Sequence, residues 1–223
     1  MRVIDAESLS DCARAIDSGE IVVVPTRRWY MLCADAGDAG ACERIFAAKA
    51  RPRHKPLCLV WPSTAELSKS FVVNEAARKL VRTLWPGDLA LMLPWADPLD
   101  GEVYPAVGTL SALVTQDPGV LGQLTAMTRR PLATAVVSFS TGSAVPLPAP
   151  AISLGEVQSF LVTNSLTSTL VVDGGICPAA NHLTVVDCSG EVPRTVRAGE
   201  VHQRAIDAAL ESPPSGVRHS TSK

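Results

Sequence analysis

The sequence predicts an α/β (α+β) fold in which helices pack on a twisted mixed sheet. Two observations support this class. Helical spacing of apolar residues alternates with short apolar runs along the chain, and 47% of the 223 residues are apolar, which suffices for one substantial core. We expect a folded domain over residues 1–205 and a C-terminal extension over residues 206–223. Because the end of the extension holds almost no core-forming residues, we expect it to be a mostly disordered tail.

Periodic segments define the expected elements, and Gly and Pro residues separate them. Gly19 ends the first helix, Pro25 ends the first strand, and Pro86-Gly87 closes the third helix. Apolar residues at helical spacing predict helices over residues 8–17, 39–48, 74–84, 119–129, 153–161 and 201–210. Continuous apolar runs predict strands over residues 21–24, 58–60, 89–93, 112–115, 133–137, 170–172 and 184–187.

Charge and cysteine content narrow the classes of function. A formal net charge of -2 gives no overall polycation, so RNA binding would need a local basic patch, and small-molecule chemistry is the favoured class. The six cysteines are scattered without a Cys-x-x-Cys pair, which favours reduced thiols in a cytoplasmic protein but leaves disulfides open. The N-terminus lacks a long apolar segment, and we expect no membrane association.

The segment from Lys49 to Leu57 carries the strongest chemical signal. It reads Lys-Ala-Arg-Pro-Arg-His-Lys-Pro-Leu, and its two prolines stiffen a connection that holds four cations. A guanidinium makes paired hydrogen bonds to phosphate or carboxylate, and an ammonium adds a mobile point charge. Lys49 and Arg51 are therefore candidates for binding an oligophosphate or an acyl phosphate. A solvated basic loop is the alternative interpretation.

A set of motifs in one order along the chain resembles the YrdC-like family, whose best-known members are threonylcarbamoyl-AMP synthases. The resemblance covers roughly residues 5–201 and depends on the combined order of the motifs. The motifs are Pro25-Thr26, Tyr30-Met31-Leu32, Lys49-x-Arg51-Pro52 with Pro56-Leu57, Trp85-Pro86-Gly87-Asp88-Leu89, Pro131-Leu132, Leu183-Thr184-Val185-Val186-Asp187 and Arg197-Ala198-Gly199.

The resemblance implies a twisted sheet with a concave, positively charged face, and a reaction that joins L-threonine, bicarbonate and ATP. Its product, threonylcarbamoyl-AMP, supplies the tRNA modification at adenosine 37, and pyrophosphate is released. ATP with Mg²⁺ and bicarbonate are therefore the implied cofactor and co-substrate, while no metal ligands can be assigned within the chain. A nucleotide and an amino acid or amine are the expected small-molecule partners, and net charge does not support direct RNA binding.

The resemblance also implies roles for individual residues. The catalytic pair is Lys49 and Arg51. The substrate-binding candidates are Thr26, Arg27, Arg28, Tyr30 and Met31. The nucleotide-binding candidates are Lys49, Arg51, Ser138, Ser140, Thr184 and Arg197. Core packing is the alternative for Thr26 and Tyr30, two exposed arginines at a strand end for Arg27 and Arg28, and a surface salt bridge for Arg197.

Three departures from the family pattern fall on the expected pocket. Where members usually read Pro-Thr-Asp-Thr-x-Tyr-Gly-Leu, this chain has two arginines and, in place of glycine, Met31. In the loop that usually reads Thr-Ser-Ala-Asn-x-Ser-Gly, a serine and an asparagine are replaced by Val136 and Ser138. The arginine of the usual Val-Arg-x-Pro motif is absent between Val103 and Gln123.

These departures lead to three functional hypotheses. The first is an ATP-dependent transferase that makes an adenylated carbamate from an amino acid or amine other than threonine, with specialised metabolism as its setting. The second is an ordinary L-threonylcarbamoyl-AMP synthase. The third is a non-catalytic module that binds a nucleotide, another anion or RNA on the same face. Arg27 and Arg28 are expected either to restore charge to the pocket or to bind a larger carboxylate.

Overall fold

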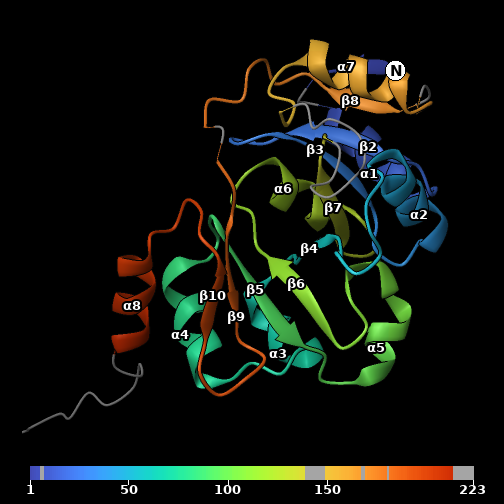
Figure 1. Ribbon diagram of the computed structural model, residues 1–223. Helices are drawn as coiled ribbons and strands as arrows, with labels where there is room; N and C mark the ends of the chain where they lie inside the picture. The colour runs from blue at the N-terminus through green and yellow to red at the C-terminus, as the bar shows by residue number, and fades with distance from the viewer. Residues whose placement is uncertain (6–7, 139–148, 167–168, 180, 213–223) are drawn as a thin grey trace, which may run out of the picture.

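The computed structural model describes residues 1–5, 8–138, 149–166, 169–179 and 181–212, and its centre is a ten-stranded mixed sheet (Figure 1). The strands lie in the order β1-β8-β2-β3-β7-β4-β6-β5-β9-β10. In sequence order they are β1 (Arg2–Ile4), β2 (Val22–Pro25), β3 (Tyr30–Asp35), β4 (Cys58–Val60), β5 (Leu89–Pro94), β6 (Ser111–Thr115), β7 (Leu132–Val136), β8 (Leu170–Val172), β9 (Thr184–Asp187) and β10 (Arg194–Arg197). The sheet combines parallel pairs such as β4 and β6 with antiparallel pairs such as β3 and β7.

The described α-helices flank the sheet, and several begin at residues whose side chains cap the first turn. The α-helices are α1 (Leu9–Asp17), α2 (Ala39–Ala48), α3 (Leu67–Ser70), α4 (Glu75–Leu84), α5 (Pro98–Val103), α6 (Val120–Met127), α7 (Leu154–Thr163) and α8 (Gln203–Glu211). The Asn74 side chain accepts the Ala77 N–H at 2.9 Å. Ser153 and Glu156 form a capping box at the start of α7. At α4 and α7, where these caps lie, the predicted starts at 74 and 153 are each one residue before the observed ones.

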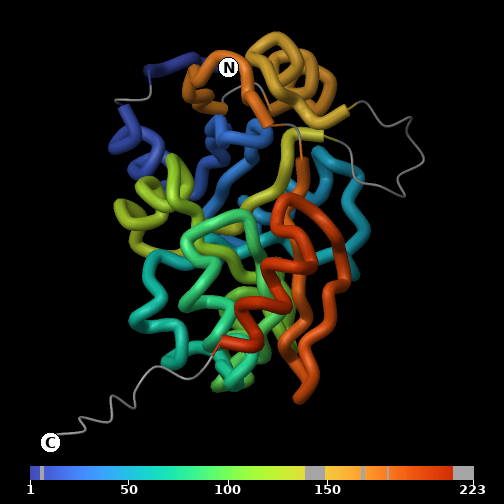
Figure 2. Tube along the Cα trace, turned by 90° about the vertical axis from the view of Figure 1, so that its left-hand side faces the viewer, coloured from blue at the N-terminus to red at the C-terminus, as the bar shows by residue number. Residues whose placement is uncertain are grey.

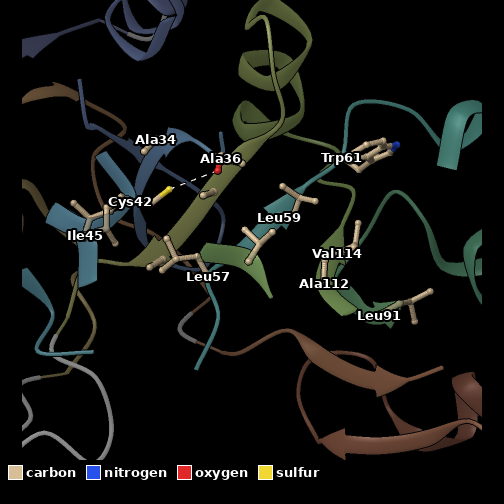
Figure 3. Close-up of a cluster of buried hydrophobic side chains, with 14 of the residues drawn as sticks. Ala34, Ala36, Cys42, Ile45, Leu57, Leu59, Trp61, Leu91, Ala112 and Val114 are labelled. Atoms are coloured by element: carbon tan, nitrogen blue, oxygen red, sulfur yellow. Dashed lines mark hydrogen bonds between the residues drawn. The ribbon is translucent and has the colours of Figure 1, made fainter. Parts of the chain in front are cut away.

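Alternating side chains of the central strands divide the core between the two faces of the sheet. Val22 and Val24 of β2 belong to a cluster of buried residues that includes apolar side chains of α1 and α6, whereas Val23 belongs to a cluster that extends over α2, α4, α7 and α8. Figure 3 shows part of the second cluster, in which Cys42 and Ile45 of α2 lie near residues of the central strands. Both faces of β2 are therefore buried, as is usual for a central strand.

A stack of aromatic rings anchors the end of β5. Phe71 is 1% exposed and lies between Trp61, whose ring centroid is 5.1 Å away in an edge geometry, and Trp95, which is stacked at 4.6 Å. Tyr104 stacks on Trp95, with the two ring centroids 5.8 Å apart. The Trp95 indole N–H donates to the carbonyl of Gly108 at 2.8 Å. Aromatic pairs at these distances stabilise the fold beyond their buried area.

The predicted α/β class is confirmed, and the structure adds strands that simple periodicity did not reveal. β3 was not predicted, although Tyr30 to Ala34 form a continuous apolar run, because a short run of this kind occurs in buried helices as well as in buried strands. The edge strands β1 and β10 were also not predicted. The helix expected over 201–210 corresponds to α8, which packs beside α4 (Figure 2).

The division at residue 205 stays a prediction, and α8 runs across that boundary. Ile206 and Ala209 of this helix are each 1% exposed, so the part of the extension nearest the domain contributes to the core. Residues 213–223, where the tail was expected, lie outside the described residues. Within the described ranges, no helix combines the length and apolar character that a membrane span requires.

Candidate active site

The floor of the candidate site is a row of side chains across neighbouring strands. Backbone register places Thr134 of β7 opposite Cys58 of β4, and Cys58 opposite Leu113 of β6. On the next row, Met31 of β3 pairs with Val136 of β7. Together with Arg28, Trp29, Arg51, Ala135, His182, Leu183 and Arg197, these residues line a cavity of about 110 Å³. We call it the inner cavity.

Lys49, at the end of α2, is held inside the protein beside this floor. The residue is 2% exposed, and its ammonium donates to the backbone carbonyls of Val136 and Ser138 and lies 3.5 Å from the Ser138 hydroxyl. Burial, and secondarily the charge of Arg51, lower the Lys49 pKa to about 7. Its charge can therefore change near neutral pH when an anion arrives.

Arg51, in the loop after α2, and Arg197, at the end of β10, both line the inner cavity with their side chains. The Arg51 Nε donates to the Lys55 carbonyl at 2.8 Å and its Nη2 to the Pro56 carbonyl at 2.7 Å, which fixes the basic loop around the side chain. Arg197 Nε donates to the Leu183 carbonyl at 3.0 Å. Burial lowers the pKa of both guanidiniums, and neither has a carboxylate partner among the described residues.

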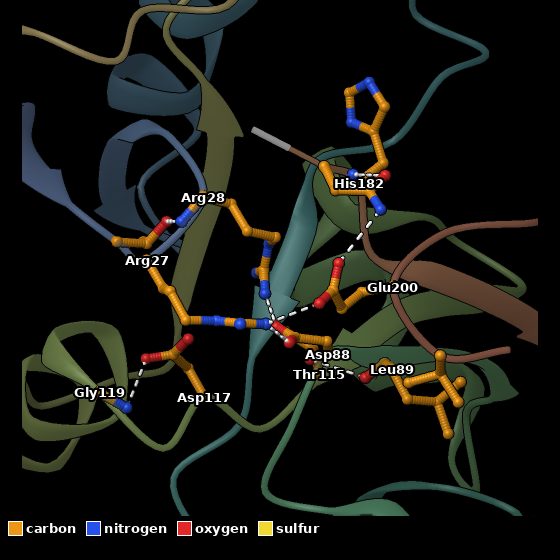
Figure 4. Close-up of polar contacts among 12 residues, drawn as sticks. Arg27, Arg28, Asp88, Leu89, Thr115, Asp117, Gly119, His182 and Glu200 are labelled. Carbon is orange, nitrogen blue, oxygen red and sulfur yellow. Dashed lines mark hydrogen bonds and ion pairs between the residues drawn. The ribbon is translucent and has the colours of Figure 1, made fainter. Parts of the chain in front are cut away.

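Arg27 and Arg28 lie at the turn between β2 and β3, and both bind Asp88 (Figure 4). Their environments differ, because the Arg28 side chain is 8% exposed and the Arg27 side chain is 53% exposed. Arg27 also lies 3.3 Å from the Glu200 carboxylate. Through these ion pairs, the two arginines connect the β2–β3 turn to the start of β5 and to the segment after β10.

A second, outer cavity of about 410 Å³ adjoins the first. Thr26, Arg27, Asp88, Asp117 and Gly174 are among its lining residues, and Arg28 lines both cavities. It is therefore Arg28, of the two predicted arginines, that reaches the space shared with Arg51 and Arg197.

The hydroxyls of three predicted site residues hold backbone segments. Thr26 Oγ1 donates to the Trp29 carbonyl at 2.8 Å and accepts the Arg28 and Trp29 amides, which closes the β2–β3 turn. The fully buried Tyr30 donates to the Gly175 carbonyl at 2.9 Å. Thr184 donates to the Val201 carbonyl at 2.8 Å. Their roles in binding substrate or nucleotide stay predictions.

The remaining predicted residues divide between the cavity wall and the part outside the description. Met31 lines the inner cavity beside Val136, and Ser138 contacts Lys49 at the end of β7. Ser140 lies outside the described residues. In the segment where the family pattern leads us to expect an arginine, Leu113 faces the cavity.

Sequence reasoning missed several residues of the site. Asp88 binds both arginines across the fold, and the rings of Trp29 and His182 lie beside the inner cavity with centroids 5.6 Å apart and planes tilted by 43°. Burial first, and then the nearby charges of Arg197 and Arg28, lower the His182 pKa. Burial raises the Cys58 pKa to about 11, so its thiol is uncharged in the cavity floor. Asp88 belongs to the motif from Trp85 to Leu89, to which no ionic role was assigned, and these pairings join residues far apart in sequence.

Comparison with known proteins agrees with this arrangement. The model of the Sua5/YciO/YrdC family, described as "Telomere recombination", matches residues 14–199. A putative threonylcarbamoyl-AMP synthase of Mycobacterium tuberculosis is 29% identical over 88% of this chain and 86% of its own length. The threonylcarbamoyl-AMP synthase of Bacillus subtilis is 27% identical over 91% of this chain, which spans 56% of that relative.

Solved structures give the same assignment. Pyrococcus abyssi Sua5 in complex with L-threonine matches with a TM-score of 0.79 and 26% identity over 94% of this chain and 60% of the Sua5 chain. Escherichia coli YciO, at 19% identity and a TM-score of 0.70 over 92% of this chain and 97% of its own, shares the fold. The chain belongs to the Sua5/YciO/YrdC family. It is an enzyme of the threonylcarbamoyl-AMP synthase-like type.

Proposed function

We propose that this enzyme joins L-threonine and bicarbonate and activates the product with ATP, forming threonylcarbamoyl-AMP and pyrophosphate. The observation that carries the proposal is that Arg51 and Arg197 line one cavity of a synthase-like fold, while buried Lys49 donates to the carbonyl of Val136 in the wall of that cavity. The names of the relatives support threonine as the acceptor. These names favour threonine over another amino acid or amine, which was the first of the three hypotheses from the sequence. Supply of the tRNA modification at adenosine 37 is part of this proposal.

The proposed chemistry has two bond-forming steps. The threonine nitrogen bonds to the carbon of bicarbonate and water is lost, which gives a carbamate. A carbamate oxygen then attacks the α-phosphorus of ATP, the bond to the bridging oxygen breaks, and pyrophosphate leaves. Negative charge grows on the phosphoryl oxygens during attack. Fixed cations that already face those oxygens lower the barrier, and this is the role of Lys49 and Arg51.

The other predicted residues complete the proposed site. Ser138, Thr184 and Arg197 contact the nucleotide, while Thr26, Arg27, Tyr30 and Met31 shape the place of the acceptor. Arg28 lines both cavities and lies between the two. Mg²⁺ would enter with the phosphates of ATP and keep water ligands. Among the described residues, no three His, Cys, Asp or Glu side chains lie close enough together to hold a metal ion.

A second candidate acceptor, another amino acid or amine, is favoured by one specific observation. Three apolar side chains line the outer cavity, which adjoins Arg27: Pro25, Pro118 and Val120. An apolar wall rejects a hydroxyl that finds no partner, so such a cavity favours an acceptor that is less polar than threonine. Specialised metabolism would then be the setting of the reaction.

Pyrophosphate release from ATP, followed with one component omitted at a time, tests the proposed function. We expect release to require bicarbonate and an amino acid together, with threonine the best acceptor of a panel. A larger kcat/KM for an apolar amino acid or an amine would select the second candidate. ATP binding without turnover on any acceptor would exclude both reactions and leave a nucleotide-binding module. Binding of tRNA, measured separately, tests the RNA-binding alternative.

The lowered pKa of Lys49 predicts proton uptake when ATP binds. With a pKa of about 7, the free Lys49 side chain is mostly neutral at pH 8, and the phosphate charge favours its ammonium form. If the bound ammonium is fully protonated, about 0.9 proton enters the site at pH 8 and about 0.1 at pH 6. Affinity for ATP therefore falls as the pH rises above 7.

Calorimetric titrations with ATP in buffers of different ionisation enthalpy measure this uptake. The Lys49→Met variant provides the baseline, because protons taken up by the nucleotide itself remain in that variant. Equal proton uptake by the wild-type and variant proteins at pH 8 would show that Lys49 does not take up the proton.

A further inference from the structure

Arg28 is a charged residue in a buried position, where a charge needs an ionic partner. The residue is 6% exposed, and its Nη1 binds the Asp88 carboxylate. A buried guanidinium is stable only when its charge is balanced and its N–H groups are satisfied. Among the described residues, Nη1 has an ionic partner, and no partner is found for the other two nitrogens of this guanidinium. Its other donors are available to a ligand.

Asp88 holds Arg28 in this position. The carboxylate binds Arg28 from one side and Arg27 from the other, and Arg27 has a second anion, Glu200, at 3.3 Å. Glu200 in turn accepts the Asn181 side-chain amide at 3.1 Å. Arg27 is therefore anchored twice, while Asp88 is the carboxylate that contacts Arg28 within the described residues.

The inner cavity carries an excess of positive charge. Three guanidiniums line it, from Arg28, Arg51 and Arg197, and none of the described residues that line it is Asp or Glu. Its volume of about 110 Å³ is far smaller than the 410 Å³ of the outer cavity. A phosphoryl group is small and carries the charge that the three guanidiniums would balance, whereas a whole nucleotide is much larger.

One more donor lies beside this space. Trp29 also lines the inner cavity, and its indole N–H is buried without a hydrogen-bond partner in the described part of the protein. A buried donor without a partner is uncommon and costs free energy unless a bound group accepts from it. The three guanidiniums favour an oxyanion in the inner cavity, and Trp29 forms part of its wall.

We propose that the inner cavity binds one phosphoryl group of the nucleotide, that Arg28 supplies the third guanidinium for it, and that Asp88 is the positioning residue that aims Arg28. The inference rests on the proposed function only in taking the oxyanion to be a phosphate of ATP. It assigns Arg28 to the phosphate, and it leaves Arg27 at the outer cavity, where the acceptor approaches.

The opposite wall offers a direct test, because Leu113 lines the same cavity as Arg28 but comes from β6. An arginine at position 113 would deliver a guanidinium to the same space from the other side. If the function of Arg28 is to supply charge there, Leu113→Arg compensates for its loss. If Arg28 only braces the turn, a cation on another strand cannot replace it.

Calorimetric titration with inorganic pyrophosphate and, separately, with ATP compares the variants. Because a hydrogen bond to a charged group is worth 1.5–3 kcal/mol, Arg28→Ala is expected to weaken binding of both ligands by roughly 10-fold to 150-fold. Adding Leu113→Arg to Arg28→Ala should raise the affinity for both ligands again by tenfold or more. Arg53→Ala is the matched control, because Arg53 is 60% exposed and pairs with Glu43 away from the cavity.

Asp88→Asn tests the positioning role through non-additivity. It should change pyrophosphate affinity when Arg28 is present and have no effect in the Arg28→Ala background, since the two residues act as one unit. Thermal unfolding of every variant confirms that the ligand is offered a folded protein. Arg28→Lys, which keeps the charge but loses the planar fork, should bind more weakly than the wild type.

Binding of pyrophosphate and ATP by Arg28→Ala within twofold of the wild type would overturn the inference, as would failure of Leu113→Arg to improve on the folded single variant. Absence of pyrophosphate binding by the wild type would also overturn it. The proposed function is judged separately by turnover. A protein that binds pyrophosphate through Arg28 yet releases none from ATP would contradict the reaction while supporting this site.

Discussion

Replacing Lys49 by methionine is expected to lower kcat for pyrophosphate release by at least about 100-fold, the loss typical when one preorganised donor to a developing oxyanion is removed. Lys49 is 2% exposed and already faces inward between the end of β7 and the basic loop, so its ammonium needs little rearrangement to meet a phosphate. Methionine keeps much of the length and apolar stem but removes the charge.

Lys69→Met is the matched control, because the Lys69 side chain is 70% exposed and pairs with Glu66 on the surface. Its kcat should stay within twofold of the wild-type value. Urea denaturation of the Lys49 variant separates chemistry from folding, since the carbonyls of Val136 and Ser138 also lose their donor. A folded Lys49→Met protein with wild-type kcat would remove Lys49 from the proposed reaction.

Replacing Phe71 by alanine is expected to lower the free energy of unfolding by about 3–5 kcal/mol. The ring is 1% exposed between Trp61 and Trp95, and both contacts are lost when it is truncated. Because these neighbours belong to different segments, they cannot easily collapse into the cavity left behind. Denaturant titration followed by circular dichroism measures the change.

Leu99→Ala provides the comparison, because Leu99 is 61% exposed on α5. Its free energy of unfolding should change by no more than about 0.5 kcal/mol, the usual range for a surface substitution. If Phe71→Ala cost as little as Leu99→Ala, the aromatic stack would not be an anchor of the fold.

Local signals were enough to predict much of the fold. Helix α2 follows its apolar spacing, with Asp38 capping its first turn, and the short strands β4, β8 and β9 coincide with apolar runs. Caps and apolar periodicity are properties of neighbouring residues, so a sequence displays them directly. β3 was missed although Tyr30 to Ala34 form an apolar run, because periodicity alone does not separate a short buried strand from a buried helical segment.

The candidate site was only partly accessible from the sequence. Lys49 and Arg51 stand out because two cations and two prolines share one short loop. The partnership of Arg28 with Asp88 joins residues 60 positions apart, and the placement of Leu113 opposite them depends on strand order and register. Such contacts follow from topology, which periodicity does not specify.

Mass spectrometry of reactions with ¹³C-bicarbonate tests the central claim most directly. The enzyme is incubated with ATP, Mg²⁺ and L-threonine, quenched rapidly, and the adenylated products are resolved by mass. We predict threonylcarbamoyl-AMP that carries one ¹³C in its carbamoyl carbon, formed together with pyrophosphate and at a rate lowered by Lys49→Met. Wild-type protein that binds ATP but forms no ¹³C-labelled carbamoyl adenylate, with threonine or with any other amino acid or amine, would contradict the account.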